Sequence, residues 1–145
     1  MTELENYLSN LRTFGVRPGL ENTQNAVAAL KAKFNIQKEP KFLHVAGTNG
    51  KGSTCAFLDS ILREANYKVG LFTSPHLIEL RERIRINGEM IGESRFEELA
   101  LEVKTLGLEL TFFEYLTVIA WLYFSLEACD YVVWALSSGL SLPGS

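Results

Sequence analysis

Hydrophobic and polar positions alternate along the chain with two periods, one typical of helices and one typical of strands. Apolar residues recur every three or four positions in five segments, which predicts helices over about 4–11, 22–34, 53–66, 94–106 and 112–126. Short apolar runs predict core strands over 42–46, 69–72 and 130–134. Charged and apolar residues alternate around Asn87-Gly88, which predicts a hairpin over 81–91. This order of elements predicts an α/β fold.

Local signals mark where several helices should begin. Asn22 or Thr23 is suited to cap the second helix, and the pairs Ser94/Glu97 and Thr111/Glu114 have capping-box spacing. The last helix is nearly all apolar, but it is too short for a membrane span and is bracketed by acidic residues. We therefore expect a helix buried in a protein core and no membrane partner.

The segment His44–Cys55, HVAGTNGKGSTC, joins the first strand to a helix through a glycine-rich turn that contains Lys51. Glycines allow successive backbone N–H groups to point at one anion, and the helix start adds unpaired N–H groups and a positive dipole end. The spacing departs from the standard P-loop, since Val45 stands at the first glycine position, and Asn49-Gly50 alone would also suit a hairpin. The helical spacing that follows favours a phosphate loop. Its candidate ATP-binding residues are Gly47, Thr48, Asn49, Gly50, Lys51, Gly52, Ser53 and Thr54.

With this loop, the pattern predicts a P-loop three-layer α/β/α fold with a mainly parallel sheet and a small β-hairpin insert. A strand, crossover helix and strand give parallel pairing, and ligands then bind at the carboxyl ends of the strands. The segment Thr73–His76, which leaves the second strand, should therefore lie beside the phosphate loop. His44 is expected to be packed in its strand, and the two histidines and two cysteines have no metal-ligand spacing.

Composition narrows the class of protein further. With 145 residues and 47% hydrophobic content, we expect one domain with its own core. A net charge of −3 gives no field that would attract nucleic acid. The acidic amino terminus has no apolar signal segment, and Cys55 and Cys129 are interpreted as buried reduced thiols, so a cytoplasmic protein is expected. A monomer is expected as well.

Four ordered motifs resemble folylpolyglutamate synthase/dihydrofolate synthase, a folate branch of the Mur-ligase superfamily. They are Val45–Thr54, Thr73–Leu77, Glu82–Gly88 and Thr111–Thr117. The resemblance implies an ATP-dependent ligase that adds L-glutamate to folate or dihydropteroate through an acyl phosphate, with Mg²⁺ as cofactor. It implies Lys51 as the catalytic residue, Ser74 with Ser53 at the metal, and substrate contacts from His76, Arg83, Phe113 and Glu114.

The residues by themselves leave other interpretations open for these positions. A Ser-Pro-His loop is often only a turn, arginines on an alternating strand are usually solvated, and aromatic residues at a helix start are usually core. The resemblance also ends near Val133: Ala135 stands where the family has a metal-binding glutamate. We expect residues 1–134 to form a partial, truncated ligase domain with little activity alone and residues 135–145 to be a disordered, non-family tail. The alternative is a non-catalytic P-loop nucleotide-binding fragment.

Overall fold

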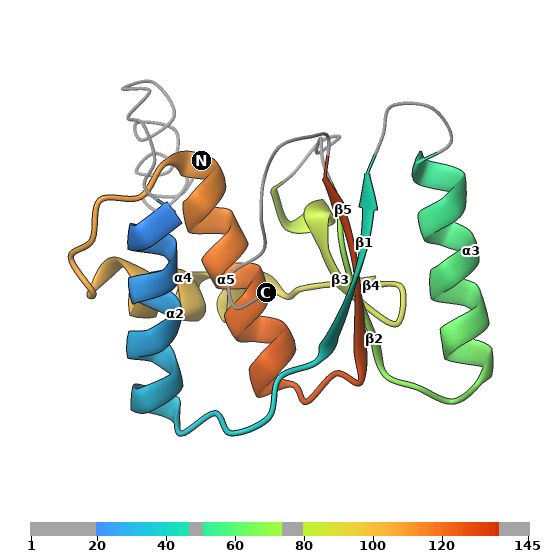
Figure 1. The fold of residues 1–145 in the computed structure, drawn as a ribbon, viewed down its shortest axis with the longest axis horizontal. Coiled ribbons are helices and arrows are strands. Elements are labelled where there is room, and N and C mark those ends of the chain that lie inside the picture. The colour runs from blue at the N-terminus through green and yellow to red at the C-terminus, as the bar shows by residue number, and fades with distance from the viewer. Residues whose placement is uncertain (1–19, 47–50, 74–79, 137–145) are drawn as a thin grey trace. The chain divides into compact units, whose positions relative to one another are not determined.

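The computed structural model describes residues 20–46, 51–73 and 80–136 (Figure 1). The predictions for the first helix, for loop residues 47–50, for residues 74–79 and for tail residues 137–145 lie outside this part of the chain. The elements are the helices α2 (Leu20–Phe34), α3 (Lys51–Glu64), α4 (Glu93–Lys104) and α5 (Phe112–Leu126), the 3₁₀ helix η1 (Leu80–Arg83), and the strands β1 (Lys41–Ala46), β2 (Val69–Phe72), β3 (Ile84–Ile86), β4 (Glu89–Met90) and β5 (Tyr131–Leu136). The α/β class is confirmed.

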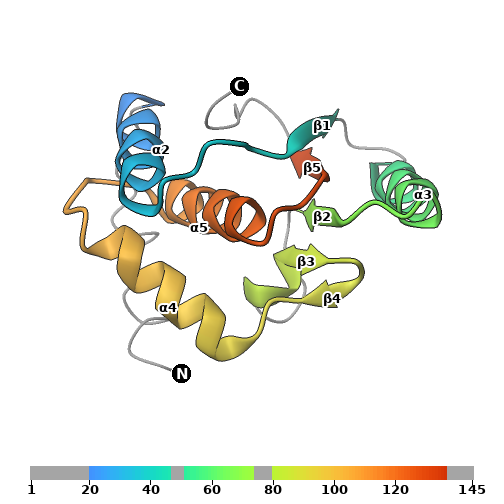
Figure 2. The same ribbon diagram turned by 90° about the horizontal axis from the view of Figure 1, so that it is seen from below.

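The described strands form one mixed sheet in the order β1-β5-β2-β3-β4, which Figure 2 shows end on. β5 pairs in parallel with β1 on one side and β2 on the other, whereas β3 and β4 add antiparallel pairs. β1 and β2 are therefore parallel to each other, as the strand-helix-strand pattern predicted, but β5 separates them. The predicted hairpin is confirmed, and Asn87 and Gly88 have φ values of 47° and 86°, as a type I′ turn requires.

The chain divides into two units, of which one contains the sheet and α3. Helix α3 covers one face of this sheet through a cluster formed by Cys55, Val69, Val133 and Ala135. The opposite face is aromatic, because side chains alternate along each strand. There Phe72 stacks on Trp134 at a ring distance of 4.3 Å.

The last turn of α5 belongs to the same unit and packs closely on this aromatic face. The ring of Phe124 is fully buried and contacts Trp134 edge on. A Cβ atom on Gly70 would lie 2.6 Å from Cδ1 of Phe124. The helix can approach the strand this closely only because Gly70 has no side chain.

The second unit contains α2, α4 and most of α5. Nearly every residue of α5 is buried, as predicted, and the Tyr115 hydroxyl donates to the backbone carbonyl of Ala100 in α4. The side chain of Asn22 donates to the carbonyl of Glu109, so it connects α2 to the segment before α5 and does not cap α2. The capping prediction is wrong because α2 begins earlier, at Leu20.

Of the other two predicted capping boxes, one is present and one is not. Thr111 and Glu114 form a reciprocal capping box: Glu114 Oε1 accepts from the Thr111 amide at 2.9 Å, and Thr111 Oγ1 accepts from the Glu114 amide at 3.2 Å. Helix α4 begins at Glu93, so Ser94 is already inside the helix and cannot cap it. No described helix is long and apolar enough to cross a membrane.

Candidate functional site at the carboxyl edge of the sheet

The predicted phosphate loop connects two well-defined elements. β1 ends at Ala46 and α3 begins at Lys51, two residues earlier than predicted. The loop candidates Gly47, Thr48, Asn49 and Gly50 lie outside the described residues, whereas Lys51 and Gly52 open the helix. The first backbone N–H groups of a helix have no partner within the helix, and the dipole makes this end positive. The start of α3 can therefore accept an anion.

Two hydroxyl side chains lie in the first turn of this helix. Ser53 and Thr54 are both exposed, while Cys55, which follows them, is buried against the sheet. Helix packing thus directs the cysteine inward and leaves the two hydroxyls in solvent. An exposed hydroxyl at a helix start can contact a phosphate oxygen or a metal ion bound to it.

The ends of the three parallel strands meet at one edge of the sheet. Phe72 pairs with Trp134 across β2 and β5, and Trp134 pairs with His44 across β5 and β1. The segment that leaves β2 at Thr73 therefore starts at the same edge as the loop that leaves β1. Ser74 and His76, the candidates on this segment, lie outside the described residues. His44 is exposed, so the expectation that it is packed in the sheet is wrong.

Arg83 lies at this edge of the sheet, beside the end of β2. Its backbone carbonyl accepts a hydrogen bond from the Thr73 amide at 3.1 Å, which continues the pairing of β2 with β3. Only 7% of Arg83 is exposed. Arg83 is therefore buried next to the segment that leaves β2, whereas an arginine on an alternating strand is usually exposed to solvent. Its contact with a substrate stays a prediction.

The neighbouring arginines hold the hairpin together. Arg81 Nη1 donates to the carbonyl of Ile91 at 3.0 Å. Arg85 donates from Nε to the Glu82 carbonyl and from Nη1 to the Gly88 carbonyl, both at 3.2 Å. Both side chains are half-buried, so these arginines are not a solvated face either. The alternation was misleading because the segment up to Arg83 is a 3₁₀ helix and not a strand.

Phe113 and Glu114 lie in the helical unit, at the start of α5. Glu114 is buried and caps the helix, and Phe113 is half-buried. Both positions therefore have a structural role that does not depend on a substrate.

Ala135 lies in β5 beside Val45 of β1. It is buried against Cys55 and Val133 beneath α3 and carries no oxygen that could hold a metal. In the described part of the chain, no three His, Cys, Asp or Glu side chains are grouped as a metal site.

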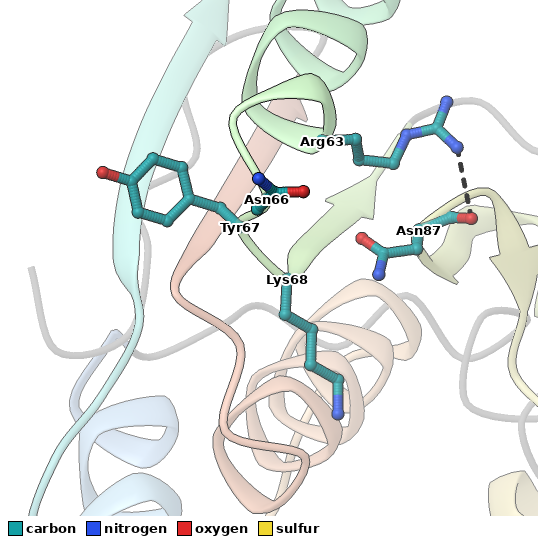
Figure 3. Close-up of a pocket in the computed structure, with 5 residues that line it drawn as sticks. All are labelled: Arg63, Asn66, Tyr67, Lys68 and Asn87. Atoms are coloured by element: carbon teal, nitrogen blue, oxygen red, sulfur yellow. Dashed lines mark hydrogen bonds between the residues drawn. The ribbon is translucent and has the colours of Figure 1, made fainter.

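Sequence reasoning missed a pocket of about 390 Å³ at the other end of α3, shown in Figure 3. It is lined by Arg63, Asn66, Tyr67, Lys68 and Asn87. The lining comes from the last turn of α3, from the segment that follows α3 and from the hairpin turn, and Asn66 and Asn87 both have positive φ. The sequence analysis predicted one of these turns, Asn87-Gly88, and not the turn at Asn66.

Beside this pocket, α3 carries a buried carboxylate. Asp59 is 6% exposed, and its Oδ2 accepts from Arg63 Nη2 at 3.0 Å. Burial raises the pKa of the Asp59 carboxyl, although the adjacent Arg63 guanidinium opposes this effect. The ion pair therefore compensates a charge that would be costly to bury alone.

These features define the class of protein: an α/β protein in which a parallel strand, a glycine-containing loop and a helix meet at the carboxyl edge of the sheet. No protein-family model matches the chain. Dihydrofolate synthase/folylpolyglutamate synthase of Bacillus subtilis is 40% identical over 135 residues, which are 87% of this chain and 31% of that protein. The chain belongs to the folylpolyglutamate synthase/dihydrofolate synthase family, as the four motifs indicated.

Solved structures give the same result. E. coli FolC in complex with DHPP and ADP matches with a TM-score of 0.82 and 36% identity, over 95% of this chain and 34% of that one. A bifunctional folylpolyglutamate synthase/dihydrofolate synthase with Mn, AMPPNP and L-glutamate bound matches with a TM-score of 0.80 and 31% identity, over 97% of this chain and 34% of that one. The chain spans between 17% and 31% of the length of five curated relatives that it matches.

Proposed function

We propose that this chain supplies the phosphate-binding part of an ATP-dependent ligase that joins L-glutamate to folate or dihydropteroate. The observation that carries the proposal is the connection from Ala46 at the end of β1 to Lys51 at the start of α3. The connection starts at Ala46, at the edge of the sheet where β2 ends and where Arg83 is buried. Related structures that contain ADP with DHPP, and AMPPNP with L-glutamate, support the same assignment.

The proposed reaction has two steps. A carboxylate oxygen of the folate substrate attacks the γ-phosphorus of ATP, the bond to the β–γ bridging oxygen breaks, and ADP leaves. The amine of glutamate then attacks the acyl carbon of the acyl phosphate, loses a proton, and displaces phosphate to leave an amide. Both steps concentrate negative charge on phosphate oxygens, so the main requirements are neutralisation and in-line positioning.

The residues of the loop and of α3 would meet these requirements. Lys51 would place a positive charge at the γ-phosphate, and the loop amides from Gly47 to Gly52 would surround the β- and γ-phosphates. The dipole of α3 would favour the same anion. In this proposal Lys51 is the catalytic residue, because it would contact the group that is transferred.

The donor set fits Mg²⁺ in part. The exposed hydroxyl of Ser53 lies in the first turn of α3, as a phosphate-bound Mg²⁺ requires, and Ser74 is the second proposed ligand. Ala135 supplies no carboxylate, so the ion would be held mainly by phosphate and water oxygens. When bound, Mg²⁺ neutralises phosphate charge. We expect weak metal retention in the absence of nucleotide.

Four residues are proposed to bind the folate substrate. Arg83 would pair with the substrate carboxylate, since a guanidinium matches carboxylate geometry. Phe113 would stack on the pteridine ring and Glu114 would orient it, in addition to its capping role, while His76 would border the substrate. These assignments rest on the family motifs and on the place of Arg83 at the carboxyl edge.

A second candidate function is nucleotide binding without ligation. The buried methyl group of Ala135, where the family motif implies a carboxylate, specifically favours it. The two functions differ in one measurable property: dihydropteroate should strengthen nucleotide binding if the folate site is intact, and should have no effect if only the phosphate site remains.

The test of the proposal is titration of the purified chain with MgATP in a calorimeter. The Lys51→Ala variant should lose most of the binding, because one charge-assisted contact at a phosphate is removed. Lys104→Ala, at the exposed end of α4, is the matched control and should bind like the wild type. If the wild-type chain is folded but binds no MgATP, or if both variants bind equally, the proposal is wrong.

A further inference from the structure

Arg63 connects helix α3 with the turn of the β3–β4 hairpin. Its Nη2 lies 3.0 Å from Asp59 Oδ2 within the helix. Its Nη1 donates to the backbone carbonyl of Asn87 at 3.3 Å, a contact drawn in Figure 3. We call this set of contacts, from Asp59 through Arg63 to Asn87, the Arg63 bridge.

The helical end of the bridge is fixed by burial. Asp59 is 6% exposed, and its Oδ1 has no hydrogen-bond partner among the described residues. A buried carboxylate with one of its oxygens unpartnered depends strongly on its ion-pair partner. Arg63 is therefore held in place by Asp59, and its second N–H group is directed at the hairpin.

The hairpin end of the bridge is equally well defined. The Asn87 amide donates to the Val69 carbonyl at 2.8 Å, and Asn87 Oδ1 accepts from the Val69 amide at 2.9 Å. Arg63 also lies close to the next residue of the turn, since a Cβ atom on Gly88 would be 3.1 Å from Nη1. Hydrogen bonds thus connect the turn both to the start of β2 and to α3.

The short strand β3 links this turn to the carboxyl edge of the sheet. It runs from Ile86, next to Asn87, to Ile84, next to Arg83, and pairs with β2 along its whole length. Only the three residues of β3 separate the turn from Arg83. The last turn of α3 contacts the hairpin turn at one end of β3 through the Arg63 bridge, and Arg83 precedes the other end of β3.

We propose that Arg63 is a positioning residue for the substrate site: it sets the hairpin against α3 and thereby sets Arg83 against the first turn of α3. The inference rests on the proposed function for the role of Arg83. Lysine cannot replace arginine in this role, because one ammonium group cannot contact a carboxylate and a carbonyl in the fixed geometry of a guanidinium fork.

Three variants of the full chain test the positioning role. Arg63→Lys retains the positive charge beside Asp59 but loses the fork. Arg63→Gln leaves Asp59 buried without a counter-charge and should lower stability. The double variant Asp59→Asn/Arg63→Gln removes both charges and should recover much of that stability. Arg95→Gln is the matched control, because Arg95 pairs with Glu98 on the surface of α4.

Two measurements are made on each variant. The first is amide hydrogen exchange of Asn87 by NMR, which reports opening of the turn. The second is the affinity for dihydropteroate in the presence of MgATP. We expect Arg63→Lys to exchange about fivefold faster at Asn87 and to bind dihydropteroate about fivefold more weakly, as the loss of one hydrogen bond predicts, with MgATP affinity unchanged. The control should match the wild type.

The double variant separates positioning from stability. If it recovers stability while its dihydropteroate affinity stays low, the positioning role is supported. If affinity returns together with stability, or if Arg63→Lys behaves like the wild type in both measurements, the proposal is overturned. If the wild-type chain binds no dihydropteroate, the proposed function fails, and the exchange rate of Asn87 alone decides: faster exchange in Arg63→Lys supports the bridge, and unchanged exchange overturns it.

Discussion

The contact between Gly70 and Phe124 predicts a large effect from the addition of one methyl group. In Gly70→Ala the new Cβ atom would lie 2.6 Å and 2.8 Å from Cδ1 and Cε1 of Phe124, closer than carbon atoms can approach without movement. The ring cannot easily move, because Phe124 is fully buried and packs edge on against Trp134. Helix α5 or strand β2 must therefore shift.

The expected magnitude follows from two opposing effects. Overpacking of a core site costs about 1–3 kcal/mol, whereas replacing glycine by alanine recovers about 0.4–1 kcal/mol by restricting the unfolded chain. The net loss should be about 1–2 kcal/mol. For a chain of this length, that corresponds to a fall in Tm of roughly 2–8 °C.

Urea denaturation followed by circular dichroism measures this loss. Gly92→Ala is the matched control, because a Cβ atom there has no neighbour within 4 Å, and its stability should be within about 0.5 kcal/mol of the wild type. Phe124→Leu combined with Gly70→Ala should destabilise less than the sum of the two single changes, since the smaller side chain relieves the contact. Strict additivity, or a fully stable Gly70→Ala, would refute the close packing described here.

Two further predictions concern a helix cap and a thiol. Thr111→Ala removes the hydroxyl that accepts a hydrogen bond from the Glu114 amide. This change should lower the free energy of unfolding, measured by urea denaturation, by about 1 kcal/mol. Thr105→Ala, at an exposed position just after α4, should lower the free energy of unfolding by less. Burial raises the pKa of Cys129 from 9.0 to about 12, so its contribution to stability is fully present below pH 9 and is lost as the pH rises from 9 toward 12. Cys129→Ala should therefore flatten the decline of Tm between pH 8 and 10.5, and a decline as steep as that of the wild type would contradict this explanation.

Local patterns were sufficient for the elements whose signals lie within a few residues. The β2 strand Val69–Phe72 and the capping box of Thr111 with Glu114 are found where they were predicted. Asn87-Gly88 forms the expected turn because only two residues decide its geometry. Ser94 was a false signal: the same spacing occurs, but the helix begins one residue earlier.

Features that depend on distant contacts could not be predicted in this way. The insertion of β5 between β1 and β2 depends on pairing with strands far away in the sequence. The burial of Arg83 and the Arg63 bridge likewise depend on where the hairpin lies against β2 and α3. The pocket next to Arg63 combines turns around Asn66 and Asn87, and no local period connects them. Site residues such as Lys51 were predicted from motifs, and their roles stay a prediction.

The most direct test of the central claim is to locate MgADP on the folded chain by NMR titration. We expect the NMR signals of the backbone amides of Gly52, Ser53 and Thr54, at the start of α3, to shift on binding. Amides of Asn66 and Asn87, in the pocket at the opposite end of α3, should not shift. Shifts confined to that pocket, or no shift at the start of α3 at saturating nucleotide, would contradict the assignment of the phosphate site.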